Sequence, residues 1–312
     1  MGLENYIEQV GLHIKEYLPK ELRNAELLIR PQRKNNEMLL HGLAFIIPDQ
    51  YICPVLYLEN YYQDYQNGAG MEDTFYHIGR DYLSALKNIN NQNIDLSYYR
   101  IKSNIFPCAV NAERNRCMLN TVPHKKMEDL AVLYRCMIPG VNNKTGSIMI
   151  NHSMLNGWGI SQRELHSQAL QNMGHLFTMD FQPMETVIAK LLGFPNPVNE
   201  LAHNESGMYV LTNTEEYYGA SYLCCSDVLE WVSEKIKGNF LVLPSSINEL
   251  VIIKETDEID VGDIKEMVEI SNIMGVSGIE YLSDNIYRYD GKNQTLSMIT
   301  ENELQQGMRL LQ

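Results

Sequence analysis

The 312-residue sequence lacks long apolar runs and the short motifs that identify the common enzyme chemistries. No segment approaches the ~20 consecutive apolar residues that a helix needs to cross a bilayer, so the sequence predicts no membrane span. It also lacks the glycine-rich loops that bind nucleotides, the HExxH and GxSxG motifs of hydrolases, and the EF-hand loop. These absences leave any functional site to be assembled by the fold from residues far apart in the sequence.

The sequence also has no local grouping of metal ligands. Its six cysteines include no CxxC spacing, and none of its eight histidines is four residues from another histidine or from a cysteine. We therefore expect neither a bound metal nor a cofactor. Unpaired, mostly buried thiols are typical of a reducing compartment, and the acidic, amphipathic N-terminal residues do not resemble a signal peptide. Together these features predict a cytoplasmic protein.

Basic residues are scarce in the last third of the chain. Residues 1–198 carry 18 Lys and Arg against 19 Asp and Glu, whereas residues 199–312 carry 7 against 20, so that most of the net charge of −14 lies in the second range. Such an acidic region repels a phosphate backbone, which disfavours nucleic acid as a partner. The change in charge predicts an N-terminal α+β region over 1–198 and an acidic C-terminal region over 199–312. The alternative is one continuous domain.

Local patterns predict an α+β fold with mixed, partly antiparallel sheets. An N-terminal helix over residues 3–18 places Tyr6, Val10, Ile14 and Leu18 on one face. Turn signals then separate three strand-like runs, which predicts an antiparallel meander. The strand-like runs cover residues 26–30, 38–47 and 52–58. Helices are expected after them over residues 61–66 and 71–88.

The clearest pattern in the chain is a βαβ-like unit in the C-terminal third. Residues 208–212 and 240–243 are apolar on both alternations, as in strands buried on both faces, and the helix between them permits a right-handed parallel pair. Residues 249–253 predict an antiparallel return. Asp227, followed three residues later by Glu230, predicts a capping box for the helix, and Gly238 predicts its C-terminal end.

Earlier in the chain, Ser161 and Glu164 predict a second capping box at the start of another helix. The last helix is expected from about Glu301.

Two polar segments contain the candidate catalytic residues. His124 and Asp129 fall in a charged stretch before a strand, where His124 could act as a base or contact an anion from a loop. The alternative is a solvated turn in which Asp129 caps the strand. Ser245 and Ser246 follow a buried strand, where open α/β sheets hold their sites, and could supply a nucleophile or backbone donors. The alternative is a tight turn that needs no function.

Several segments, in order along most of the chain, carry a resemblance to a known family. They are Arg33-Lys-Asn-Asn36 with Leu40-His-Gly42, Pro54-Val-Leu-Tyr-Leu-Glu59, Asp129-Leu-Ala-Val132, Met208-Tyr-Val-Leu-Thr-Asn213 with Gly219-Ala220, Leu243-Pro-Ser-Ser-Ile247 and Leu282-Ser-Asp284. Together they resemble a bacterial family known as domain of unknown function 5688. The resemblance implies one architecture over most of the chain, and it brings no activity, cofactor or ligand. The family pattern has histidine after Pro-Ser-Ser-Ile, where this sequence has Asn248, which argues against chemistry at that loop.

Two hypotheses of function follow from these patterns. The first is a non-enzymatic binding or regulatory protein, whose acidic third contacts a protein partner or a second copy of the chain. The alternative is a hydrolase-type enzyme in which the fold brings His124 and Asp129 together with Ser245 or Ser246.

Overall fold

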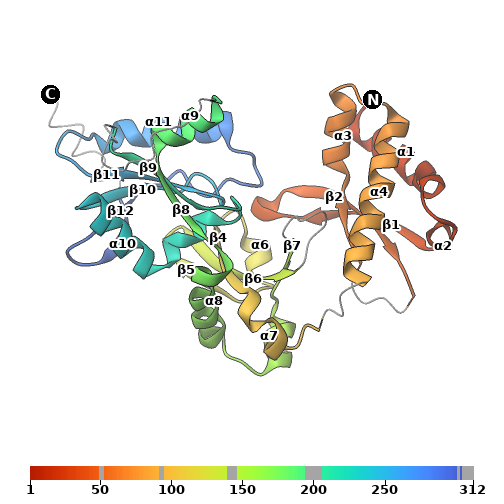
Figure 1. Cartoon of the computed structure of the whole chain (residues 1–312), viewed down its shortest axis with the longest axis horizontal. Coiled ribbons are helices and arrows are strands. Elements are labelled where there is room, and N and C mark those ends of the chain that lie inside the picture. Colours follow the sequence, from red (N-terminus) through yellow and green to blue (C-terminus); the bar gives the residue numbers. More distant parts are fainter. Residues whose placement is uncertain (49–52, 91–94, 139–145, 194–205, 301–302, 304–312) are drawn as a thin grey trace. The chain divides into compact units, whose positions relative to one another are not determined.

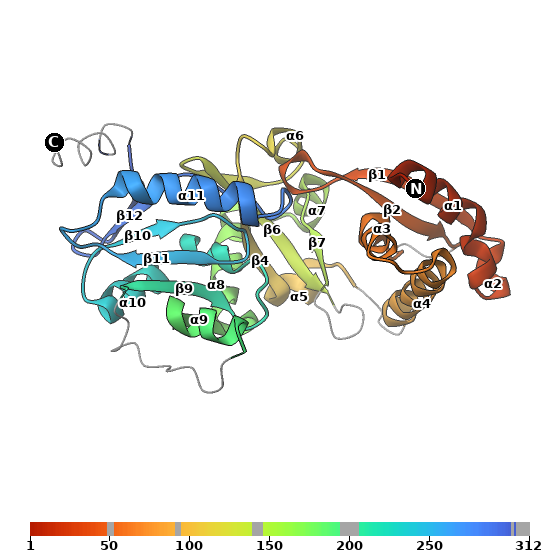
Figure 2. The same ribbon diagram turned by 90° about the horizontal axis from the view of Figure 1, so that it is seen from above.

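The computed structural model describes residues 1–48, 53–90, 95–138, 146–193, 206–300 and 303. Figure 1 shows its ribbon, and Figure 2 shows the same ribbon after a quarter turn. The chain forms two compact units. The first comprises Met1–Ile101 and Met137–Ile148, and the second comprises Lys102–Cys136 and Met149–Gln312.

The first unit contains the predicted antiparallel meander. Its sheet has the order β1-β2-β3, with both pairings antiparallel, so the predicted topology is confirmed. The third strand is only two residues long. The elements of this unit are β1 (Glu26–Arg33), β2 (Leu39–Ile46), β3 (Leu56–Tyr57), α1 (Leu3–His13), α2 (Lys20–Arg23), α3 (Leu58–Gln66), α4 (Met71–Asn90) and α5 (Tyr98–Ile101), with 3₁₀ turns at Ile14–Tyr17 and Asn35–Glu37.

The core of the first unit forms between the N-terminal helix and one face of the meander. The four residues predicted to share a helical face, Tyr6, Val10, Ile14 and Leu18, are all buried in it. Alternate residues of β2, Leu43 and Phe45, face them, as expected for a strand with one buried face. The backbone N–H of Phe45 donates to the hydroxyl of Tyr82 from α4 at 2.9 Å, so this buried polar group is satisfied.

The second unit is built on a six-stranded antiparallel sheet and a smaller sheet. The larger sheet has the order β13-β12-β10-β11-β9-β8, and the smaller has the order β4-β6-β5. The strands are β4 (Ile105–Asn111), β5 (His124–Met127), β6 (Leu130–Ile138), β8 (Met179–Pro183), β9 (Met208–Asn213), β10 (Phe240–Leu243), β11 (Leu250–Lys254), β12 (Tyr287–Asp290) and β13 (Thr295–Met298). The last two residues of β6 and most of β7 (Gly146–Met149) belong to the residue range of the first unit. The predicted α+β class is confirmed.

Helices cover both faces of the larger sheet. In Figure 1, α9 and α11 lie on one side of it and α10 lies on the other. Because both faces are covered, all four residues of β10 are buried, as its apolar sequence predicts. The helices of the unit are α6 (Arg116–Leu119), α7 (His152–Trp158), α8 (Gln162–Leu176), α9 (Met184–Leu191), α10 (Ser226–Ile236) and α11 (Val261–Gly275), with 3₁₀ turns at Lys102–Asn104 and Gly219–Cys224.

The βαβ-like unit is present, but its two outer strands are not neighbours. Both β9 and β10 pair antiparallel with β11, which lies between them. They therefore run in the same direction without sharing hydrogen bonds, and the expected parallel pair is wrong. The predicted antiparallel return is confirmed, because the loop after β10 turns the chain back so that β11 occupies the position beside β9.

Helix ends follow the predicted signals only in part. The capping box of Ser161 and Glu164 is present at the start of α8. In α10, Cys225 occupies the N-cap position without a side-chain bond and Asp227 lies inside the first turn, so the capping box expected there is wrong. A 3₁₀ turn ends directly before this helix and moves its start by two residues. At the other end Lys237, at φ 57°, adopts the left-handed conformation expected of Gly238.

The predicted boundary at residue 198 lies outside the described residues. The larger sheet nevertheless contains strands from both sides of it, because β8 pairs with β9. The division of the chain at this point therefore stays a prediction. The predicted last helix also falls outside the described residues, apart from Glu303. Within the described residues, no helix is long and apolar enough to cross a membrane.

Gly219 provides a test of the packing between β9, the 3₁₀ turn and the loop before β11. A Cβ at this position would overlap the carbonyl oxygen of Asn248 and lie 2.9 Å from Cα of Thr212. We expect Gly219→Ala to lower the free energy of unfolding of the second unit by about 1–3 kcal/mol, because both neighbours are backbone atoms that cannot yield locally.

The same substitution at Gly174, inside α8, is the matched control. No atom lies within 4 Å of the added Cβ there, and alanine favours a helix by up to ~1 kcal/mol over glycine. Urea unfolding followed by tryptophan fluorescence reports on the second unit alone, because Trp158 and Trp231 are the only tryptophans and both lie in it. Equal effects of the two substitutions would contradict the packing described above.

Candidate functional site

The second unit contains a polar pocket of about 630 Å³. Residues of three separate segments line it: 111–116 between β4 and α6, 126–129 around the β5–β6 turn, and 281–285 before β12, with Lys265 of α11. Its volume falls in the range of ~300–1,000 Å³ that is typical of small-molecule sites. The pocket is therefore the candidate functional site.

Asp129 is fixed at this pocket by a two-residue hairpin loop. Met127 of β5 pairs with Leu130 of β6, which leaves Glu128 and Asp129 as the loop. Glu128 adopts φ 52°, in the left-handed region that such tight loops use. The backbone N–H of Ala112 donates to the carbonyl of Asp129 at 2.9 Å and holds the loop against the end of β4.

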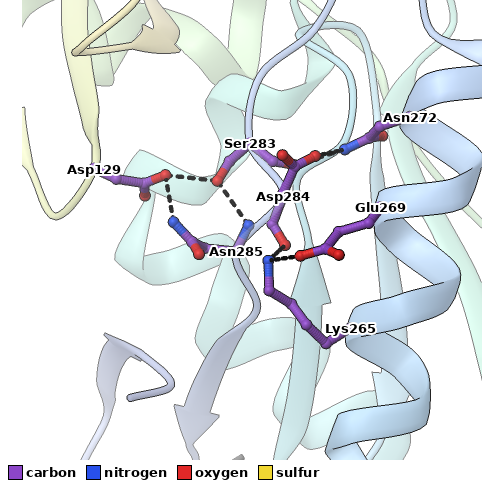
Figure 3. Close-up of polar contacts among 7 residues, drawn as sticks. All are labelled: Asp129, Lys265, Glu269, Asn272, Ser283, Asp284 and Asn285. Atoms are coloured by element: carbon purple, nitrogen blue, oxygen red, sulfur yellow. Dashed lines mark hydrogen bonds and ion pairs between the residues drawn. The ribbon is translucent and has the colours of Figure 1, made fainter. Parts of the chain in front are cut away.

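The carboxylate of Asp129 accepts hydrogen bonds from three side chains. The hydroxyl of Ser283 donates to it at 2.6 Å and the amide of Asn285 at 2.9 Å, as Figure 3 shows, and the hydroxyl of Tyr287 donates to its other oxygen. Burial, and then the charge of Asp129, raise the pKa of Tyr287 well above its usual value. The tyrosine therefore stays a hydrogen-bond donor to this carboxylate at neutral pH.

Helix α11 holds the same segment from the other side. The amide of Asn272 donates to the carboxylate of Asp284 at 2.7 Å and to the carbonyl of Ser283 at 3.0 Å. The ammonium of Lys265 donates to the carbonyl of Asp284 at 2.8 Å and pairs with Glu269 at 2.9 Å. Figure 3 shows residues 283–285 between Asp129 and the helix. Residues 283–285, which form one wall of the pocket, are thus held by Asp129 on one side and by α11 on the other.

The end of β4 positions an arginine beside the pocket. The side chain of Asn111 donates to the carbonyl of Leu282 at 3.0 Å, and its oxygen accepts the backbone N–H of Arg114 at 2.9 Å. The guanidinium of Arg114 lies 3.6 Å from the ring centre of Tyr281, as in a cation–π contact. Burial, and then the neighbouring Asp284, raise the pKa of Tyr281 to about 12. The ring therefore stays neutral beneath the guanidinium.

Two cations at the pocket form no ion pair with any residue that the structure describes. Arg116 forms an ion pair with Glu113 at 2.9 Å. By contrast, neither Arg114 nor Lys126 forms an ion pair with any residue in the described part of the chain, and both side chains line the pocket. The site therefore offers a guanidinium and an ammonium to an incoming group.

The sequence predicted a loop at His124, but the structure has a strand there. Residues 124–127 form β5 and pair with residues 130–133 of β6, so the loop placement is wrong. Nδ1 of His124 lies 3.1 Å from the carbonyl oxygen of Val122, and the residue does not line the pocket. This strand was not predicted because of its charged residues. It lies at the edge of its sheet, where such side chains reach solvent.

The loop over residues 244–248, the serine loop, contacts residues 281–285 of the pocket through its backbone. The N–H of Leu282 donates to the carbonyl of Ser245 at 3.0 Å, and the hydroxyl of Ser246 accepts the N–H of Asn248 at 3.1 Å. Asp129 and the serine loop therefore contact one common segment. Over the described residues, no hydrogen bond joins His124 to Asp129, Ser245 or Ser246, so the structure does not link the four predicted residues into a catalytic arrangement.

Asn248 has a structural role in this loop. Its side-chain oxygen accepts the N–H of Tyr218 at 3.3 Å, its amide donates to Glu280 at 3.2 Å, and its carbonyl accepts the hydroxyl of Thr212 at 2.7 Å. The asparagine side chain serves two of these neighbours and the backbone serves the third, and folding alone explains these contacts.

The residues that form the pocket wall were not predicted from the sequence. Ser283, Asp284 and Asn285 are turn-forming residues before β12, and two of them belong to a segment that carries the family resemblance. Ser283 and Asp129 are 154 residues apart in the chain, and no local pattern reports such a contact. The only available signal was that both segments contribute to the resemblance.

All six cysteines are free in the structure. Burial raises the pKa of Cys224 to about 12, so this thiol stays protonated. The described residues contain no group of three His, Cys, Asp or Glu side chains that could hold a metal ion.

Comparison with known proteins identifies a family but no relative of known activity. The model described as "Family of unknown function (DUF5688)" matches residues 3–291. Neither a curated protein nor a solved structure matches the chain.

The first prediction for the site concerns the carboxylate of Asp129. We expect Asp129→Asn to lower the free energy of unfolding of the second unit by about 2–3 kcal/mol, because hydrogen bonds to a charged group are lost and an amide N–H is turned toward a donor. Urea unfolding followed by tryptophan fluorescence measures the change. Glu113→Gln, at the exposed rim, is the control and should cost less than about 1 kcal/mol. A cost for Asp129→Asn no larger than that of the control would show that Asp129 does not anchor the segment.

A second prediction concerns the pKa of His166 in α8, which lies beside β5. Its Nδ1 is 3.1 Å from the hydroxyl of Tyr134 and its Nε2 is 3.5 Å from the ammonium of Lys125. Burial, and then the charge of Lys125, lower the pKa of this imidazole. We expect Lys125→Met to raise the pKa only part of the way to its ordinary value, because the burial remains. An NMR titration, with His166→Gln to assign the resonance, measures the shift.

The adjacent substitution Lys126→Met is the control and should leave that pKa unchanged, since neighbouring strand residues point to opposite faces. Because the folded-state pKa is lowered, the neutral imidazole stabilises the fold above the unfolded-state value of about 6.5. That contribution is lost as the pH falls through the folded-state pKa. The stability of His166→Gln should therefore depend less on pH over this window. Equal shifts from the two lysine substitutions would argue against the contact with Lys125.

Proposed function

Because the chain belongs to the Family of unknown function (DUF5688), which supplies no activity, we propose a function from the pocket itself. The protein is a non-enzymatic binding protein whose second unit binds a small, polar, anionic ligand. The observation that carries this proposal is the pair of cations, Arg114 and Lys126, that line the pocket without an acidic partner among the described residues.

Arg114 differs from the other arginine that lines the pocket. Arg116 pairs with the exposed Glu113 at 2.9 Å. Arg114 forms no ion pair within the described residues and lies against the ring of Tyr281. A guanidinium held by stacking on Tyr281 presents its N–H groups as a fork that matches a carboxylate or a phosphate. Both features favour an anion as the ligand.

The fixed wall of the pocket also favours binding. Residues 283–285 are held by Asp129 on one side and by Asn272 and Lys265 of α11 on the other. A site whose wall is already ordered loses little conformational entropy when a ligand binds.

The contacts of the predicted catalytic residues give less support to a hydrolase. The oxygens of Asp129 already accept three hydrogen bonds, and the hydroxyl of Ser246 serves its own turn. His124 has no hydrogen bond to either residue in the described part of the chain. A nucleophile requires a base within hydrogen-bond reach, and these contacts do not supply one. The hydrolase hypothesis remains a prediction from the sequence.

Isothermal titration at low ionic strength, with citrate and inorganic phosphate as separate probes, tests the proposal. We expect Arg114→Gln and Lys126→Gln each to weaken binding of the preferred probe roughly tenfold, since a lost charge-assisted hydrogen bond costs at least ~1.4 kcal/mol. Added salt should weaken binding to the wild-type protein more than to either variant.

Arg163→Gln, which removes an exposed cation outside the pocket, is the matched control and should leave the affinity unchanged. Equal losses in all three variants would mean that the anion responds to overall charge. An anion site at this pocket would be refuted if neither citrate nor phosphate bound and other small anions, at the same concentrations, also failed to bind.

A further inference from the structure

Helix α11 is apolar on the face that it turns to solvent as well as on the face that it turns to the sheet. On the inner face, Ile264 and Val268 pack against a core that includes Leu241 and Ile253 of the larger sheet. A helix on a protein surface is normally polar on its opposite face. The large apolar side chains on that face of α11 are Met267, Ile270, Ile273 and Met274, with exposed fractions of 43%, 50%, 85% and 83%.

The spacing of these residues forms one stripe. Met267, Ile270 and Met274 follow each other at three and four residues, and Ile273 lies three residues after Ile270. Residues at these separations are neighbours on a helix surface, and the stripe extends over about two turns. This is the pattern by which one helix packs its ridge of side chains against a second helix. The stripe is therefore a surface suited to an amphipathic helix.

The exposed charges of α11 are mostly acidic: Asp263, Glu266 and Glu269. The only basic residue of the helix, Lys265, donates to the carbonyl of Asp284 and pairs with Glu269. Asp263 and Glu266 form no ion pair within the described residues. A partner that covers the stripe would therefore lie beside these two carboxylates, and a basic rim is complementary to them.

The same charges disfavour two other occupants. A second copy would bring the acidic residues beside one stripe against those beside another, in a chain whose net charge is already −14. An anionic lipid surface would be repelled in the same way. Methionine side chains such as Met267 and Met274 adapt to the shape of a partner, as at other helix-binding surfaces.

We propose that the outer face of α11 is a docking surface for a basic, amphipathic helix of a partner protein. The stripe contacts the apolar side of that helix, and Asp263 and Glu266 contact Lys or Arg residues at its edges. This inference does not depend on the proposed anion site, because none of the residues of the stripe lines the pocket.

A synthetic helix of about 18 residues, with leucine along one face and lysine elsewhere, is the probe. Its binding to the full chain is followed by fluorescence anisotropy. We expect the double variant Ile273→Ser, Met274→Ser to bind it at least tenfold more weakly. Glu266→Gln should weaken binding severalfold and reduce its salt dependence. All of these side chains are exposed, so the variants should fold, which circular dichroism checks.

The matched control is Leu191→Ser, Leu192→Ser at the end of α9. These two adjacent apolar residues are 82% and 68% exposed, comparable with the pair in α11. The control should bind like the wild-type protein. A second peptide, with glutamate in place of every lysine, should not bind.

Three outcomes would overturn the proposal. The first is an equal loss of binding in the α9 control, which would mean that any exposed apolar pair attracts the peptide. The second is equal binding of the glutamate peptide, which would remove the charge argument. The third is self-association of the chain, measured by sedimentation equilibrium and abolished by the α11 double variant, which would make a second copy the occupant.

Discussion

The second unit depends on one carboxylate that joins segments far apart in the chain. Asp129 lies in the loop of a tight hairpin, and its oxygens accept hydrogen bonds from residues 154 to 158 positions later. Through Ser283 and Asn285 it holds the pocket wall, and through Tyr287 it holds the start of β12. The hairpin belongs to the smaller sheet, whereas Tyr287 begins β12 of the larger sheet, so the carboxylate links the two sheets.

The fold could be predicted from the sequence where a pattern is local. Tyr6, Val10, Ile14 and Leu18 are buried together as their spacing predicts, although the α-helix ends at His13 and not at residue 18. The turn signals between three apolar runs were enough for the meander. The order of β9, β11 and β10 could not be obtained in this way, because it depends on which strand edge the returning chain reaches. Strand β5 was missed because its residues, His-Lys-Lys-Met, are those of an exposed edge.

The candidate site was predictable in one residue out of several. Asp129 was identified as polar and adjacent to a strand, yet its contacts with Ser283 and Asn285 follow only from the tertiary structure. Arg114 was not predicted, because its importance comes from Tyr281 beneath it and from the lack of an ion pair to it among the described residues. Ser245 and Ser246 were placed correctly beside a buried strand. Their loop contributes backbone to the segment behind the pocket, with Leu282 as its contact.

The double hold on residues 283–285 also makes α11 a lever. Lys265 and Asn272 are rigid parts of one helix, and both grip the backbone or side chain of the pocket wall. A shift or rotation of the helix, even of a fraction of an ångström, changes both contacts together. The two proposed sites, on α11 and at the pocket, therefore share one helix. If each ligand favours a different position of α11, linkage requires that each change the affinity of the other by the same factor.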